Sequence, residues 1–159
     1  MHRERGFSLI ELLIVVGIIL VLAALAIPSL LRAKISANEA SAVSAVRSIH
    51  SAQTQYAQYY PMLGYADDIA KLGPPSSGPS NPSNANLLDF VLGCGSQPCA
   101  KSGYNFKIDQ TSGAPINAFR ITAVPITPGR TGNRGFCSTE PGVITADPAG
   151  GTTCSENIN

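Results

Sequence analysis

The chain has 159 residues, the length of one ordinary domain, and this leaves no room for a second domain of enzyme size. Its formal net charge is +1, and its 11 lysines and arginines are scattered, so bulk recognition of DNA or RNA is not expected. Only 13% of the residues are charged, and this low average hides one very apolar segment beside a polar remainder.

The apolar segment covers residues 7–31 and reads FSLIELLIVVGIILVLAALAIPSLL, with Glu11 as its one ionisable side chain. As a helix, residues 7–27 would be about 31 Å long, close to the ~30 Å hydrocarbon thickness of a bilayer. The segment is therefore predicted to span a membrane. Its flanks, MHRERG on one side and Arg32 with Lys34 on the other, carry equal numbers of basic residues, so charge does not orient it.

A cleaved secretory signal is the first alternative for this segment. The apolar run is longer than a usual signal core, Glu11 interrupts its start, and no small-x-small cleavage site precedes Arg32. These three features favour a retained membrane segment.

Glu11 is the odd residue, because a carboxylate at the membrane centre costs on the order of 2.5 to 3.5 kcal/mol. A cut between Gly6 and Phe7 would create an α-amino group one helical turn away. Opposite charges ~4 Å apart attract by about 4 kcal/mol at an effective dielectric constant near 20. The helix macrodipole also favours an acid in the first turn. The alternative is a glutamate near the lipid headgroups without a role.

The stretch Arg5-Gly6-Phe7-Ser8-Leu9-Ile10-Glu11-Leu12 resembles the processing site of type IV prepilins and the related pseudopilins. The resemblance covers about the first 30 residues. It implies that residues 1–6 are a leader, that prepilin peptidase cuts after Gly6, and that Phe7 becomes the N-methylated terminus. It also implies that Glu11 pairs with a neighbour's terminus during assembly.

By the same resemblance, the chain is expected to be a structural subunit of a type IV pilus. It would wait in the bacterial inner membrane among lipids, with a single pass and a cytoplasmic N-terminus. An inner-membrane assembly platform would then add it to a homopolymeric filament that is extracellular or periplasmic. A minor pilin or a type II secretion pseudopilin is an alternative. A membrane-anchored binding module that does not polymerise is an alternative of another class.

One long helix is predicted from about Phe7 to Tyr60, where Pro61 ends it. Its first part, residues 7–31, would form the membrane segment and filament core. Its second part, residues 32–60, is amphipathic, with a stripe at Ile35, Ala42, Val46, Ile49, Gln53, Tyr56 and Tyr60.

Two residues are expected to loosen this helix. Gly17 weakens it by about 1 kcal/mol relative to Ala, and Pro28 removes the usual partner of the Ala24 carbonyl. The resemblance to pilins implies that the span between them changes helicity between membrane and filament.

Residues 61–103 are predicted to be a loop between helix and sheet, with a short helix or turn at 86–92 to cover its apolar side chains. Alternating or short apolar runs then predict strands in the region 104–159, at 104–109, 117–124, 134–138 and 142–146. An antiparallel sheet packed on the amphipathic half-helix gives an α+β fold, the pilin-like lollipop that the resemblance also implies.

The cysteines are Cys94, Cys99, Cys137 and Cys154. If this region is exported, the expected disulfides are Cys94–Cys99 and Cys137–Cys154, and the other two connectivities remain open. A zinc site is the metal alternative, but the spacings lack paired C-x-x-C knuckles. Disulfides would orient the membrane segment, with the leader inside the cell and the C-terminal region outside.

No enzyme is indicated, and neither a metal nor a cofactor is expected. Of the two histidines, His2 lies in the leader and His50 on the helix, so no nucleophile-base pair is apparent. The Gly-rich run 129–135 is interpreted as a connection between strands. Calcium ligands could come from Asp67, Asp68, Asp109 and Asp147, but without a dense ligand run a solvated turn is the simpler interpretation.

Overall fold

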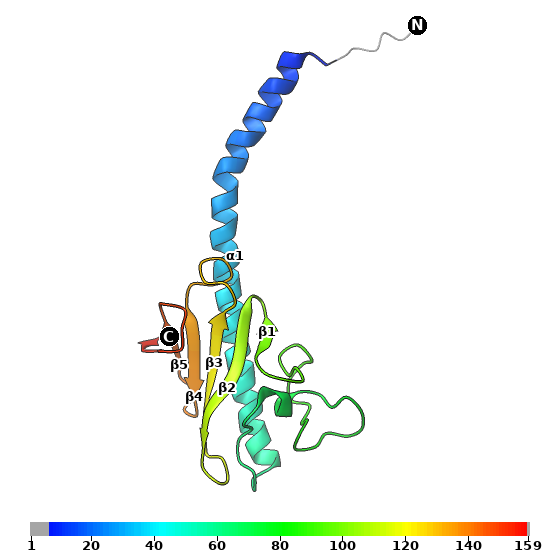
Figure 1. Ribbon diagram of the computed structural model, residues 1–159, viewed down its shortest axis with the longest axis vertical. Coiled ribbons are helices and arrows are strands. Elements are labelled where there is room, and N and C mark those ends of the chain that lie inside the picture. Colours follow the sequence, from blue (N-terminus) through cyan, green and yellow to red (C-terminus); the bar gives the residue numbers. More distant parts are fainter. Residues whose placement is uncertain (1–6, 159) are drawn as a thin grey trace. The chain divides into compact units, whose positions relative to one another are not determined.

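The computed structural model describes residues 7–158, and the chain divides into two compact units, Met1–Lys34 and Ile35–Asn159, called here the N-terminal and C-terminal units. The leader with Gly6 lies outside the described residues. The elements in Figure 1 are α1 (Leu9–Tyr59), the 3₁₀-helix η1 (Ile69–Leu72), and strands β1 (Cys99–Lys101), β2 (Tyr104–Ser112), β3 (Ala118–Pro125), β4 (Gly135–Thr139), β5 (Ile144–Asp147) and β6 (Glu156–Asn157).

The long helix predicted for 7–60 is confirmed as α1, which passes through Pro28 without a break. Within the C-terminal unit, α1 buries one face, as the stripe predicted. The buried residues are Glu39, Ala42, Ala45, Val46, Ile49, Ala52, Gln53 and Tyr56. Ile35 and Tyr60, at the ends of the predicted stripe, are only half-buried.

Gln53 is a polar member of the buried face, and its side chain is fully buried. Its amide nitrogen donates to the carbonyl oxygen of Ala66 at 2.7 Å, and its amide oxygen accepts from the Ala66 N–H at 2.7 Å. These two hydrogen bonds hold the segment after α1 against the helix, because the Gln53 amide and the Ala66 backbone satisfy each other's buried polar groups.

The six strands form one antiparallel sheet in the order β1-β2-β3-β4-β5-β6, so each strand pairs with its sequence neighbours. The four predicted strands correspond to β2, β3, β4 and β5, whereas the short edge strands β1 and β6 were not predicted. Alternate side chains of the sheet are buried against α1, and they include Tyr104, Phe106, Ile108, Phe119, Ile121, Ala123 and Phe136. The α+β architecture of one long N-terminal helix and an antiparallel sheet is thus confirmed.

A turn at residues 86–92 is confirmed, but the prediction that all of the apolar side chains there are covered is partly wrong. The segment forms turns, because the Asp89 carboxylate accepts from the N–H groups of Val91 and Leu92, at 3.0 and 2.7 Å. Leu88 and Leu92 are buried, but Phe90 is 78% exposed instead of covered.

Two disulfides close loops in the C-terminal unit. Cys94 is joined to Cys99, and Cys137 on β4 is joined to Cys154 after β5, the pairs expected for an exported region. The described residues contain no free cysteine.

Candidate functional site

The N-terminal unit presents apolar side chains with nothing around them. From Phe7 to Leu31 nearly every side chain is exposed, Phe7 itself by 81%, and none of the most apolar window of α1 is buried. By length and composition, this part of α1 could cross a membrane. An apolar surface of this size is unfavourable in water, so it needs to be covered by lipid or by other apolar protein surfaces.

Glu11 lies in the first turn of α1, and its side chain folds back on the start of the helix. One carboxylate oxygen accepts from the Ser8 N–H at 3.3 Å, while the Ser8 carbonyl accepts from the Leu12 N–H at 3.2 Å. Ser8 thus stands at the N-cap position and Glu11 is the third helical residue, and their bond is the glutamate half of a capping box. This cap was not among the predicted features, although the spacing Ser8-x-x-Glu11 is its sequence signal.

The capping contact gives Glu11 a role inside its own chain, besides the pairing that the resemblance implies. A neutral N–H satisfies one lone pair but leaves the negative charge uncancelled. The carboxylate therefore still needs an opposite charge once the segment leaves water.

The two residues expected to loosen the helix lie within unbroken α1. Apart from its chain neighbours and the adjoining helix backbone, a Cβ added to Gly17 would meet no atom of the described chain within 4 Å. The lack of a side chain at Gly17 is thus not required by packing inside a single chain.

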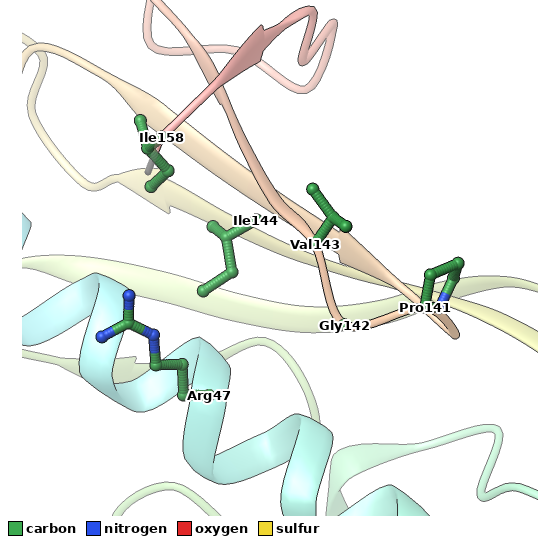
Figure 2. Close-up of a pocket in the computed structure, with 6 residues that line it drawn as sticks. All are labelled: Arg47, Pro141, Gly142, Val143, Ile144 and Ile158. Atoms are coloured by element: carbon green, nitrogen blue, oxygen red, sulfur yellow. The ribbon is translucent and has the colours of Figure 1, made fainter.

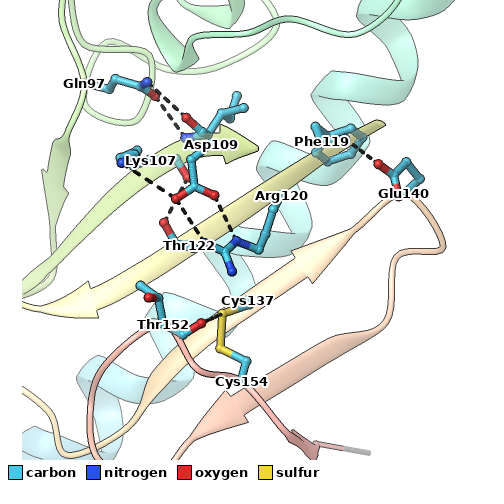
Figure 3. A network of polar contacts seen from close by, with 11 residues as sticks. Gln97, Lys107, Asp109, Phe119, Arg120, Thr122, Cys137, Glu140, Thr152 and Cys154 are labelled. Atoms are coloured by element: carbon cyan, nitrogen blue, oxygen red, sulfur yellow. Dashed lines mark hydrogen bonds and ion pairs between the residues drawn. A yellow bond between two sulfur atoms is a disulfide. The ribbon is translucent and has the colours of Figure 1, made fainter. Parts of the chain in front are cut away.

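The four aspartates that could have supplied calcium ligands have separate partners, and only Asp67 and Asp68 are neighbours in the chain. Asp67 pairs with Lys71 at 2.7 Å, and Asp68 accepts from the Ala70 N–H at the start of η1. Asp109 holds Arg120 at 2.9 Å (Figure 3), and Asp147 accepts from the N–H groups of residues 149 and 153. Within residues 7–158, no three His, Cys, Asp or Glu side chains are grouped to hold a metal ion.

His50 is half-buried beside the turn that joins β4 to β5. Its Nε2 donates to the Glu140 carbonyl oxygen at 3.1 Å, and its ring centroid lies 5.8 Å from that of Phe119. The Glu140 carboxylate in turn accepts from the Phe119 N–H (Figure 3). His50 thus joins α1 to the sheet.

Comparison with known proteins places the similarity in the N-terminal third. Residues 1–27 match the model of the prokaryotic N-terminal methylation motif. The chain is 41% identical over 54 residues to the type IV major pilin protein PilA of Myxococcus xanthus (strain DK1622), covering 34% of this chain and 24% of that protein. It is 42% identical over 55 residues to the type II secretion system core protein G of Pectobacterium carotovorum subsp. carotovorum, covering 35% of each.

The match spans about a quarter to a third of the length of these curated relatives. No solved structure matches the chain.

Proposed function

Because the N-terminal segment of this chain is that of the pilin and pseudopilin family, we propose that the chain is a structural subunit of a type IV pilus. The observation that carries the proposal is an exposed apolar helix with one acid in its first turn, directly after the Gly6-Phe7 junction. The proposed role is assembly and not catalysis.

In this proposal, prepilin peptidase cuts between Gly6 and Phe7, and Phe7 is then methylated. The mature chain waits in the inner membrane, where lipid covers the exposed side chains of residues 7–31. In the filament, the same side chains pack against the helices of other copies. Lipid is as apolar as these side chains, so close packing and charge pairing must favour the filament over the membrane.

Glu11 supplies the charge pairing. Its capping bond to Ser8 holds the carboxylate at the start of α1, where an incoming Phe7 amine of another copy could reach it. An ion pair formed away from water is far stronger than one at the surface. Each pair would cancel a costly charge and set the axial position of one subunit against the next.

The orientation in the membrane follows from the cysteines. Disulfides persist in oxidising compartments and are rare in the cytosol. Both disulfides lie in the C-terminal unit, which supports a location of that unit outside the cytoplasm.

The test is to compare processing and assembly in cells. Gly6→Leu should leave a persistent larger band on a gel, because the added side chain blocks approach to the scissile backbone. Glu11→Ala should insert in the membrane normally but enter sheared filaments at least about tenfold less, since a lost stabilisation of 1.4 kcal/mol already gives that factor. The matched control is Glu156→Ala, which removes an exposed acid from β6. Normal filament yield from Glu11→Ala would contradict the mechanism.

A type II secretion pseudopilin is the second candidate, because core protein G is as similar to this chain as PilA is. The amount of this chain in sheared surface filaments separates the two, since a major pilin dominates them. A non-polymerising binding module would be indicated by an intact leader on the mature protein.

A further inference from the structure

A groove lies inside the C-terminal unit, between α1 and the turn that joins β4 to β5. Its outer part has a volume of about 300 Å³ and is lined by Arg47, Pro141, Gly142, Val143, Ile144 and Ile158 (Figure 2). Its inner part, of about 120 Å³, is lined by Arg47, His50, Ser51, Ser138, Gly142 and Ile144. Because the two parts share three residues, they form one groove, called here the Arg47 groove.

Ser138 gives the inner part an unused hydrogen-bonding group. On β4 it follows two residues after Phe136, so both side chains face α1. Ser138 is 1% exposed, and its Oγ is buried without any hydrogen-bond partner among the described residues. Buried hydroxyls in folded proteins nearly always have a partner, and a water or a ligand atom in the inner part of the groove would supply one.

Arg47 supplies a positive charge at the same place. Its side chain leaves α1 toward the space that Ile144 and Ile158 border (Figure 2). No ion pair or hydrogen bond of its guanidinium is found within residues 7–158, and no carboxylate side chain lines either part of the groove. The Glu140 carboxylate lies in the same turn and accepts from the Phe119 N–H, a bond that leaves its negative charge uncancelled. Among the described residues, the polar end of the groove therefore offers two donors, the exposed Arg47 guanidinium and the Ser138 hydroxyl, with no carboxylate in its lining.

The outer part offers a different surface. Ile144 and Ile158 present aliphatic side chains toward the space above Arg47, and Val143 and the Pro141 ring line it farther along the turn (Figure 2). A volume of about 300 Å³ is at the lower end of the range for small-molecule sites. This part suits a small apolar body.

We propose that the Arg47 groove binds a small organic carboxylate with an apolar body, such as an aromatic or short-chain acid. The carboxylate accepts hydrogen bonds from the Arg47 guanidinium and from the Ser138 hydroxyl, while the body packs on Ile144 and Ile158. The planar fork of arginine suits a carboxylate, and the small inner part limits the anion to that size. The site goes beyond filament assembly and does not depend on it.

The experiment uses the full chain in detergent micelles with labelled isoleucine and valine methyl groups. Benzoate is titrated while the methyl signals of Ile144 and Ile158 are followed by NMR. Benzamide is the matched neutral probe, because it has the same ring and enters micelles without a charge. We expect saturable shifts with benzoate and at least about tenfold weaker binding of benzamide.

Two variants test the named donors. Arg47→Gln should weaken benzoate binding at least about tenfold, and Ser138→Ala by about threefold or more. Ser138→Ala should also raise the melting temperature of the ligand-free chain, since it removes a buried group without a partner. The control is Arg130→Gln, which removes an exposed arginine in the connection between β3 and β4 and should bind benzoate like the unmodified chain.

Three results would overturn the site: no saturable shift of the Ile144 and Ile158 methyls, equal binding of benzamide, or unchanged binding by Arg47→Gln. Water alone in the groove gives the first result, and partition into micelles gives the second. The benzoate and benzamide comparison needs no variant, so it decides the question even if a substituted chain fails to fold.

Discussion

The carboxylate of Glu39 on α1 holds the guanidinium of Arg134, 95 residues later in the chain, through two hydrogen bonds of 2.9 and 2.8 Å. The other Glu39 oxygen accepts from the backbone N–H groups of Asn133 and Arg134, at 2.9 and 3.3 Å. Glu39 is buried, and Asn38 beside it donates to the Thr131 carbonyl at 2.8 Å. These bonds fasten the connection between β3 and β4 to the helix.

We expect Glu39→Ala to lower the free energy of unfolding of the C-terminal unit by about 1–3 kcal/mol, because it removes a buried carboxylate that accepts hydrogen bonds from the Arg134 side chain and from two backbone N–H groups. The control is Asp67→Ala, which breaks an exposed pair with Lys71 and should cost about 0.5 kcal/mol or less. Chemical denaturation of both variants and the unmodified chain measures the difference. Equal stabilities of the two variants would show that the buried Glu39 hydrogen bonds contribute no more to the free energy of unfolding than the exposed Asp67–Lys71 pair does.

The contribution of Glu39 should depend on pH. Burial is the largest influence and raises its pKa, but the hydrogen bonds from Asn133 and Arg134, with the Arg134 charge, together bring the pKa below its ordinary value of 4.5. A folded-state pKa below the unfolded one stabilises the fold above about pH 4.5 and loses that effect as the pH falls through the folded value. The stability difference between the unmodified chain and Glu39→Ala should therefore be constant near pH 7 and shrink below pH 4.5 in thermal unfolding. A difference that grows in acid would contradict this sign.

Gln53→Leu keeps the apolar volume of the helix face but removes both bonds to Ala66. We expect a loss of about 2–3 kcal/mol in the free energy of unfolding, since a buried N–H and a buried C=O are left unpaired. Gln58→Leu, the same change at an exposed position of α1, should change stability by less than about 0.5 kcal/mol. If Gln53→Leu and Gln58→Leu unfold at the same denaturant concentration, the prediction is wrong. Water would then be satisfying the Ala66 N–H and C=O in place of the Gln53 amide.

The two disulfides should differ in their contribution to stability. The chain-entropy description gives about 2 kcal/mol for the short Cys94–Cys99 loop and about 3 kcal/mol for the longer Cys137–Cys154 loop, whose sequence separations are 5 and 17. Double alanine variants of each pair, compared by denaturation, measure the two effects. A larger loss from the shorter loop would contradict the chain-entropy description, since each pair contains one buried cysteine, Cys99 or Cys137.

Glu11→Gln separates the two roles of Glu11. An amide oxygen can still accept from the Ser8 N–H, but it cannot cancel the charge of a neighbour's amine. If charge pairing drives assembly, Glu11→Gln should lose filament yield as strongly as Glu11→Ala. If helix capping is the main role, Glu11→Gln should assemble like the unmodified chain. Sheared filament yield, normalised to membrane-inserted subunit, decides between them.

Much of the fold was predictable because the periodicity of apolar residues within each segment indicates which element it forms. The apolar run of residues 7–31, the helical stripe that includes Val46 and Ile49, and the alternation from Tyr104 to Ile108 each reflect the period of one element. The candidate assembly segment was predictable for the same reason, because Gly6, Phe7 and Glu11 lie within one short motif.

Other features had no local signal. Strands β1 and β6 have three and two residues, too few for a period, and each forms only because a longer strand offers it an edge. Of the two forms expected at residues 86–92, a short helix or a turn, the structure has turns, because the Asp89 carboxylate competes with the backbone for N–H groups.

Sequence alone thus determined which segments of this chain are helical, extended or able to enter a membrane, because neighbouring residues set those properties. Only the tertiary structure decided that Glu39 meets Arg134, that Gln53 meets Ala66, and that the Ser138 hydroxyl lines the same groove as Arg47 with no partner among residues 7–158. Such pairs join residues from distant parts of the chain, and packing of the sheet on α1 is what brings them within bonding distance.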